Sequence, residues 1–316
     1  MLQLHKRLTE KTYGDPPRTL SSTTADAYLK TLFNLNDKKP FKNLSFLKKT
    51  DGIMAKLADY AETTKKTLLS SITSVLSLEK DNAGYKKAYK FYYDKMMEKT
   101  AEAQQKDTTV KTETQKENWL TWEEVKDKQQ ELFMKMMEDA NQKAPLSPTQ
   151  FNTLLSYIVL SLYIDVAPRR NQDYLNMYVY KALKKEKVID LPKDKNYLIV
   201  SNNLPTQFIF NVYKTSKTYG QQIVNIPDNL QICLKYYLTR VGNKAKEYKF
   251  LPIDKVNAIT RLLNKIFGKN VGSSMLRHIY LSDKYNITDM KEDAKNMGHS
   301  LAEQKAYMKI TPMLEG

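Results

Sequence analysis

The stretch that decides the fold runs from residue 196 to residue 226 and reads NYLIVSNNLPTQFIFNVYKTSKTYGQQIVNI. It contains three runs rich in β-branched and aromatic residues, separated by segments with turn chemistry. The runs are Asn196–Val200, Phe208–Tyr213 and Gln222–Ile226, and the basic segment Lys214–Gly220 separates the last two. We therefore expect a small three-stranded antiparallel sheet whose last hairpin has a basic tip.

In the sequence, helical patterns come both before and after this predicted sheet. Ser147-Pro148-Thr149-Gln150 combines a cap, a proline at the first helical position and a glutamine three residues after the cap, and a strongly apolar helix from Phe151 to Leu162 follows. Thr121 and Glu124 form a similar capping box for an earlier helix. Helical spacing returns after the sheet, so residues 119–316 predict a mixed α/β domain that is mainly helical.

The first hundred residues lack an alternating run of this kind. Apolar residues recur at helical spacing through residues 21–100, which predicts a small all-helical domain. Residues 1–20 contain one glycine and two prolines and are expected to form a flexible lead-in. Residues 101–118 are nearly all polar and cannot bury enough apolar area to fold alone, so we expect the interdomain linker there. The predicted fold class is mainly α with a small antiparallel β-sheet.

The composition favours a polyanionic partner. The chain has 51 lysines and arginines against 35 acidic residues, a formal charge of +16, and nucleic acid is the commonest partner for such an excess. Cys233 is the only cysteine and there are three histidines, so a disulfide is impossible within the chain and neither a thiolate nor a zinc site is expected. The most apolar run is too short to cross a bilayer, and no signal peptide is expected. The expected location is the cytoplasm or nucleus of a host cell.

One helical segment of the first domain mixes tyrosines with lysines. The tyrosines fit either a helix core or a surface that stacks on bases, and the lysines fit either a solvated face or contacts to phosphate. These residues are Tyr85, Tyr89, Tyr92 and Tyr93, with Lys86, Lys87 and Lys90 as the candidate DNA contacts.

Two short motifs and a tyrosine stand close to the end of the chain. The motifs are Ser274-Met275-Leu276-Arg277-His278 and Met297-Gly298-His299-Ser300. Ser300 and Glu303 form a capping box, which predicts that Tyr307 lies in the second turn of a final helix.

These residue types suit the breaking of a DNA strand without water. A tyrosine can attack a phosphodiester and retain the phosphate as an ester, although with a pKa of about 10 it is a weak nucleophile. Such a site needs fixed cations on the phosphate oxygens and an acid for the departing 5′ oxygen. Arginine suits the first task because its planar fork meets two oxygens, and a lysine on a hairpin tip suits the second. Two arginines can neutralise the phosphate, so no metal or other cofactor is required.

The order of these motifs across residues 147–308 resembles the tyrosine recombinases, or phage integrases. The resemblance rests on five features in sequence order: Arg170-x-x-Asp173 after a buried helix, a lysine in a hairpin, Leu276-Arg277-His278, Gly298-His299-Ser300, and Tyr307. The helical first domain is similar to that family's core-binding domain. The form of the first arginine motif resembles recombinases of large DNA viruses and virophages.

The resemblance implies a role for each residue. Arg170 would be the first phosphate-binding arginine, with Arg169 as its rival, and Arg277 the second. Asp173, three residues after Arg170, would orient the site rather than act as a base. Lys217 would be the general acid, with Lys214 as the alternative.

His299 would hydrogen-bond the scissile phosphate and Tyr307 would attack it, leaving a 3′-phosphotyrosine and a free 5′ hydroxyl. The sequence departs from the family at Ser274, where a histidine or lysine is usual, and this leaves open which group accepts the Tyr307 proton. Neighbours on a helix lie about 100° apart, so His278 is expected to point away from Arg277 and to be a buried, hydrogen-bonded structural residue.

The predicted function is a site-specific recombinase or integrase of a virus or mobile element, independent of metal and ATP. Its partner would be double-stranded DNA, with a homotetramer assembled on two duplexes. Two alternatives remain: a monomeric type IB topoisomerase, and an architectural DNA-binding protein without catalysis.

Overall fold

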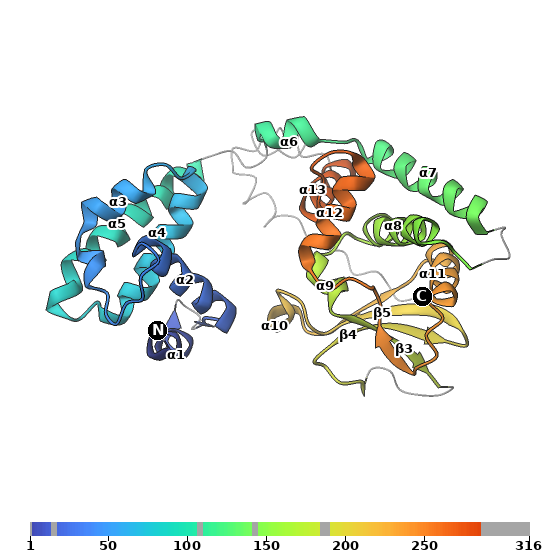
Figure 1. Ribbon diagram of the computed structural model, residues 1–316, viewed down its shortest axis with the longest axis horizontal. Coiled ribbons are helices and arrows are strands. Elements are labelled where there is room, and N and C mark those ends of the chain that lie inside the picture. The colour runs from blue at the N-terminus through green and yellow to red at the C-terminus, as the bar shows by residue number, and fades with distance from the viewer. Residues whose placement is uncertain (1, 14–17, 106–109, 141–144, 184–189, 286–316) are drawn as a thin grey trace, which may run out of the picture. The chain divides into compact units, whose positions relative to one another are not determined.

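A computed structural model describes residues 2–13, 18–105, 110–140, 145–183 and 190–285. Its elements divide into two compact units, Met1–Val110 and Lys111–Gly316. Figure 1 shows the helices and strands of each unit as ribbons, and each unit has its own hydrophobic core.

The first unit is helical apart from one short antiparallel strand pair. Its core forms because each helix turns an apolar face inward, with Leu32, Ile72 and Tyr92 fully buried. The elements in order are α1 (Leu2–Glu10), β1 (Thr12–Tyr13), β2 (Arg18–Thr19), α2 (Ser22–Leu35), η1 (Ser45–Lys48), α3 (Thr50–Leu57), α4 (Glu62–Leu76), η2 (Ser77–Glu79) and α5 (Ala83–Gln105).

Two expectations for this part of the chain need correction. The lead-in was expected to be flexible, but α1 is a helix whose Leu4 and Leu8 are buried in the core of the first unit. Apolar residues at i and i+4 give even a polar segment one face to bury. The expected linker 101–118 is also partly helical: α5 extends to Gln105, and α6 (Glu113–Asn118) begins with a capping box formed by Thr112 and Gln115.

The second unit is built around α8 (Pro148–Ile164), which is buried on most of its circumference. Its capping box at Ser147 and Gln150 is present as predicted, and so is the reciprocal bonding of Thr121 and Glu124. The other helices are α7 (Trp122–Ala140), α9 (Asn171–Leu175), α10 (Ser216–Tyr219), α11 (Asp228–Val241), α12 (Val256–Phe267) and α13 (Ser273–Lys284).

The sheet of this unit is mixed and five-stranded. The strands are β3 (Met177–Ala182), β4 (Asn196–Ser201), β5 (Leu204–Phe210), β6 (Gln222–Asn225) and β7 (Glu247–Lys249), in the order β6-β5-β4-β3-β7. The prediction of three antiparallel strands was correct in type and order for β4, β5 and β6. The prediction placed the middle strand at Phe208–Tyr213, whereas β5 ends at Phe210, because the amides of Asn211 and Val212 donate to the Asn196 side chain instead of to a neighbouring strand. It missed β3, which pairs parallel to β4, and β7, whose three residues are too few for a periodic signal.

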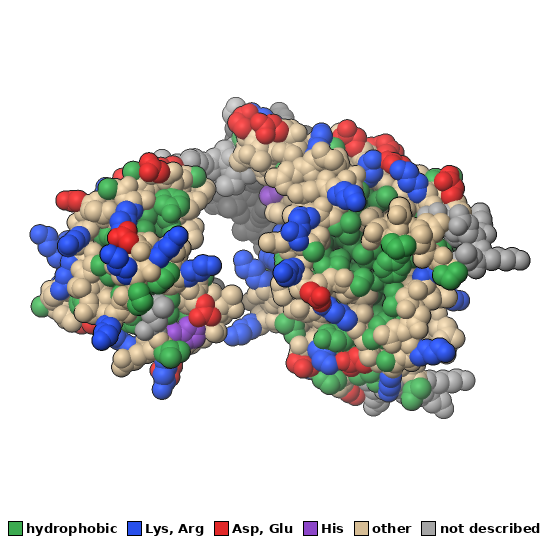
Figure 2. Space-filling view, in the orientation of Figure 1, with side chains coloured by type: hydrophobic (Ala, Val, Ile, Leu, Met, Phe, Trp, Pro, Cys, Tyr) green, Lys and Arg blue, Asp and Glu red, His purple; other side chains and the backbone are tan. Residues whose placement is uncertain are grey.

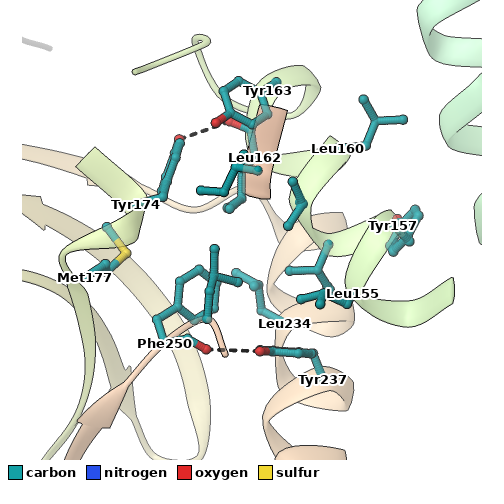
Figure 3. Close-up of a cluster of buried hydrophobic side chains, with 14 of the residues drawn as sticks. Leu155, Tyr157, Leu160, Leu162, Tyr163, Tyr174, Met177, Leu234, Tyr237 and Phe250 are labelled. Atoms are coloured by element: carbon teal, nitrogen blue, oxygen red, sulfur yellow. Dashed lines mark hydrogen bonds between the residues drawn. The ribbon is translucent and has the colours of Figure 1, made fainter. Parts of the chain in front are cut away.

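Alternate side chains of the strands face two different clusters. Leu198 and Phe208 join the main core with α8 and α11, whereas Tyr197 and Ile209 pack in a smaller cluster on the other face. In the main core, buried tyrosines donate hydrogen bonds to backbone carbonyls: Tyr174 to Leu162 and Tyr237 to Phe250, both at 3.0 Å (Figure 3). A buried phenol needs such a partner, and each bond fixes the helix that carries it.

Candidate active site

The first predicted arginine lies where α8 gives way to α9. Pro168 follows the end of α8, and Arg170 is the extended N-cap residue of α9 with φ −77° and ψ 147°. The next helical positions, Asn171 and Asp173, are buried, so α9 is anchored immediately after Arg170. The Arg170 side chain is partly exposed, and its guanidinium forms no hydrogen bond or ion pair with any residue that the structure describes. It is therefore available for a ligand.

The adjacent Arg169 has a different environment. Its Nε donates to Oδ2 of Asp173 at 3.0 Å, its Nη1 donates to Oε1 of Gln222 at 2.8 Å, and its guanidinium stacks on the ring of Phe210. Burial raises the pKa of Asp173, and the charges of Arg169 and then Arg170 oppose that rise. The Arg169 guanidinium already has partners within the protein, so Arg170 is the better candidate for binding a phosphate.

The second predicted arginine, Arg277, belongs to α13. It is partly buried at the edge of the buried face of that helix, and its Nε donates to the carbonyl of Ser273 at 3.3 Å. Burial lowers the pKa of Arg277, and the positive charge of Arg170 lowers it further, while Asp173 raises it. These influences place Arg170 and Asp173 within electrostatic range of Arg277. Three guanidinium groups around one carboxylate leave a local excess of positive charge.

A chain of buried polar contacts fixes the helices that carry the two arginines. Tyr163 of α8 donates to Oδ1 of Asn171 at 2.7 Å, and the Asn171 amide donates to Oγ1 of Thr260 in α12 at 3.0 Å. The N-cap of α13, Gly272, approaches the same threonine so closely that an added Cβ would lie 3.2 Å from its methyl carbon. The positions of Arg170 and Arg277 are therefore set by packed backbone rather than by loops.

The two candidate general acids lie on the connection between β5 and β6. Lys214 and Lys217 are exposed, and neither forms an ion pair with a described residue. Lys217 is on the one-turn helix α10 rather than on a simple hairpin tip. Asn196 fixes one end of this connection, because its side chain donates to the carbonyls of Asp173 and Val212 and accepts from two backbone amides. No contact joins either ammonium group to the arginines among the described residues.

The structural role predicted for His278 is wrong. The side chain is exposed and has no hydrogen-bond partner among the described residues. Leu276 and Ile279 define the buried face of α13, and His278 lies about 200° around the helix axis from Leu276. Ser274, at the start of the same helix, is also exposed, so its hydroxyl is accessible to a ligand.

The remaining predicted residues divide into two groups. His299 and Tyr307 lie outside the described residues, so the structure does not place the proposed nucleophile. Lys86, Lys87 and Lys90 of α5 are exposed on the first unit and form no ion pair with a described residue, whereas Lys99 of the same helix is paired with Glu62 and Glu102. Of the tyrosines on α5, Tyr92 belongs to the core and Tyr93 is exposed.

Figure 2 shows lysine and arginine side chains on the surface of the second unit around α10 and α13. The arrangement can bind an anion with two guanidinium groups, that of Arg170, which is free, and that of Arg277, which is partly desolvated. A desolvated cation attracts phosphate more strongly than a hydrated one.

Within the described ranges, no cluster of three histidine, cysteine or acidic residues could hold a metal ion.

Sequence reasoning did not anticipate Asn171, Asn196 or Gln222, which position the site. Their partners lie far away in sequence, and a single asparagine or glutamine carries no signal of such a contact.

The chain matches no family model, and it matches no curated protein and no solved structure. Among the described residues no helix combines the length and apolar character needed to cross a membrane.

Proposed function

We propose that the second unit is the catalytic domain of a DNA strand transferase of the tyrosine-recombinase type. The observation that carries the proposal is that Arg170 and Arg277, which are far apart in sequence, lie close enough for the positive charge of Arg170 to lower the pKa of Arg277. Like charges repel, so their assembly around a single buried carboxylate is costly unless a polyanion is the ligand. A DNA phosphodiester supplies the missing negative charge.

The proposed reaction divides the work among five side chains. Arg170 and Arg277 hold the non-bridging oxygens of one phosphate, with His299 as a further donor. The Tyr307 hydroxyl gives its proton to water or to a phosphate oxygen, and its oxygen attacks phosphorus. The bond from phosphorus to the 5′ oxygen breaks, and Lys217 gives that oxygen a proton. The products are a 3′-phosphotyrosine and a free 5′ hydroxyl, and reversal with a new 5′ hydroxyl joins a different strand.

The first unit would hold the duplex through its exposed lysines on α5. Solvated lysines suit this task because phosphate contacts supply affinity without reading sequence. Recombination would then require a tetramer on two duplexes. Relaxation of a supercoiled plasmid by the monomer, without strand exchange, would instead indicate a type IB topoisomerase.

The test is trapping of the covalent intermediate on a nicked duplex from which the short 5′ product diffuses away. The wild-type chain should become covalently attached to the 3′ end, and peptide mapping should find the adduct on Tyr307. Tyr307→Phe should bind the same duplex and remain unattached, whereas the control Tyr285→Phe, which removes an exposed phenol near the end of α13, should react like the wild type. An adduct that survives Tyr307→Phe would refute the assignment.

A further inference from the structure

Arg169 joins three separate parts of the second unit. Its Nε bonds to Asp173 in α9 at 3.0 Å, and its Nη1 bonds to Gln222, the first residue of β6, at 2.8 Å. Its guanidinium carbon lies 3.8 Å from the ring centroid of Phe210, at the end of β5, and 5.0 Å from that of Tyr213. The side chain is 17% exposed, so these contacts are largely shielded from water.

The contacts on the sheet side bracket one segment, residues 211–221. Phe210 precedes it, Gln222 follows it, and Tyr213 lies inside it with its ring buried. Two further bonds close the segment on itself: the Tyr213 hydroxyl donates to the carbonyl of Gly220 at 2.7 Å, and the Gln221 amide donates to Oδ1 of Asn211 at 2.7 Å. Lys214 and Lys217 are carried by this segment. Its two ends are therefore attached, through one guanidinium group, to the helix that follows Arg170.

We propose that Arg169 is a positioning residue that holds the Lys217 segment against α9, so that the proton donor and the phosphate-binding Arg170 keep a fixed separation. The inference rests on the proposed function, and it assigns to Arg169 a task distinct from phosphate binding. Arginine suits this task because its planar group bonds to Asp173 and Gln222 from different nitrogens while one face stacks on an aromatic ring. A lysine supplies the charge but cannot make these three contacts together.

The proposal predicts a specific chemical defect. If Arg169 acts only through the proton donor, its loss should slow departure of the 5′ oxygen and leave phosphate binding unchanged. A 5′-bridging sulfur departs as a thiolate and needs no proton, so cleavage of that linkage should be insensitive to the position of Lys217. A residue that binds the phosphate, or that merely supports the fold, would affect both linkages alike.

The experiment compares single-turnover cleavage of two matched nicked duplexes, one with oxygen and one with sulfur at the 5′ bridging position. Two variants are used, because loss of Arg169 leaves Asp173 buried without its ion pair and can impair folding. Arg169→Lys keeps the charge, and Gln222→Ala removes only the bond on the sheet side. The control is Gln207→Ala, which breaks the 3.1 Å side-chain bond to Asn225 on the same two strands, outside the bracketed segment.

Both variants should cleave the oxygen duplex about tenfold or more slowly than the control and the sulfur duplex within about threefold of it. Equal slowing on both duplexes, or no slowing on either, would overturn the positioning role while leaving the proposed function intact. A wild-type chain that forms no covalent product with either duplex would refute the proposed function and this inference with it.

A second measurement does not depend on activity. Trypsin cleaves after Lys214 and Lys217, so the rate of nicking at these residues in the folded protein reports how firmly the segment is held. Arg169→Lys and Gln222→Ala should be nicked there faster than Gln207→Ala. Equal nicking rates in all three would contradict the claim that Arg169 holds the segment.

Discussion

The positive charges of the two units are presented in different ways. On α5 of the first unit, Lys86, Lys87 and Lys90 are exposed and form no ion pair with a described residue. In the second unit, Arg277 is partly buried, with a pKa lowered by burial and by Arg170, and the supporting Arg169 is held by an ion pair and a stacked ring. Hydrated lysines attract any phosphate and are screened by salt, whereas fixed, desolvated guanidiniums suit one phosphate in one orientation. Under the proposed function, the first region would hold DNA and the second would act on it.

The largest expected effect is that of removing a fixed guanidinium. Arg277→Ala should slow covalent attachment by about 10²- to 10³-fold at saturating DNA, because the variant lacks one of the two cations proposed to stabilise the phosphate in the transition state. Duplex affinity should change little. The exposed Arg261 of α12 provides the control, and Arg261→Ala should react at the wild-type rate. Comparable slowing in both variants would indicate that general charge, rather than the Arg170–Arg277 site, determines the rate.

The second effect distinguishes the two lysines of the bracketed segment. Lys217→Ala should slow cleavage by about a hundredfold, as expected for loss of a general acid, and Lys214→Ala by far less. A 5′-bridging sulfur should restore the rate of Lys217→Ala. If the sulfur substrate is cleaved as slowly as the oxygen substrate, Lys217 is not the proton donor.

The third effect concerns the first unit alone. The triple change of Lys86, Lys87 and Lys90 to Gln should weaken duplex binding by about tenfold or more near physiological salt. It should also reduce the slope of log K against log[salt] by about one for each phosphate that the variant no longer neutralises. The rate of covalent attachment at saturating DNA should be unchanged. The matched control is Lys95→Gln, because Lys95 is paired with Glu98. A salt dependence that does not change would show that these lysines are only a solvated face.

The smallest effect separates the two environments of the tyrosines on α5. The Tyr92 hydroxyl is buried and donates to the carbonyl of Leu47 at 3.0 Å, so Tyr92→Phe should lower the free energy of unfolding of the first unit by about 1–2 kcal/mol. Tyr93→Phe, at an exposed position, should leave it unchanged. Chemical denaturation followed by circular dichroism measures both. Equal stabilities would mean that the buried hydrogen bond contributes nothing.

Local signals in the sequence predicted much of the fold. The capping boxes at Ser147 and Thr121, the apolar α8 and the strand runs of β4 and β6 are patterns within a few residues, and the structure contains each of them. The middle strand was predicted four residues too late at its start, because β5 begins at Leu204 rather than Phe208. The parallel pairing of β3 with β4 depends on contacts between distant segments, which local patterns do not encode. The helix α1 was missed because the glycine and prolines that follow it suggested flexibility, although Leu4 and Leu8 share one face.

The candidate site was predicted only in part. The sequence indicated Arg170 over Arg169 from the position of Asp173, and the structure places Arg169, not Arg170, in the internal ion pair. The exposure of His278 follows from which face of α13 is buried, and a motif alone does not specify that face. The support given by Asn171, Asn196 and Gln222 depends on side chains that meet only after folding.

The most direct test of the central claim replaces the scissile phosphate with an uncharged methylphosphonate. If Arg170 and Arg277 neutralise the same phosphate, Arg170→Ala and Arg277→Ala should each regain most of their cleavage rate on the neutral linkage, while Arg261→Ala remains unaffected on both linkages. Recovery of only one variant, or of neither, would contradict the convergence of the two arginines on a single phosphate.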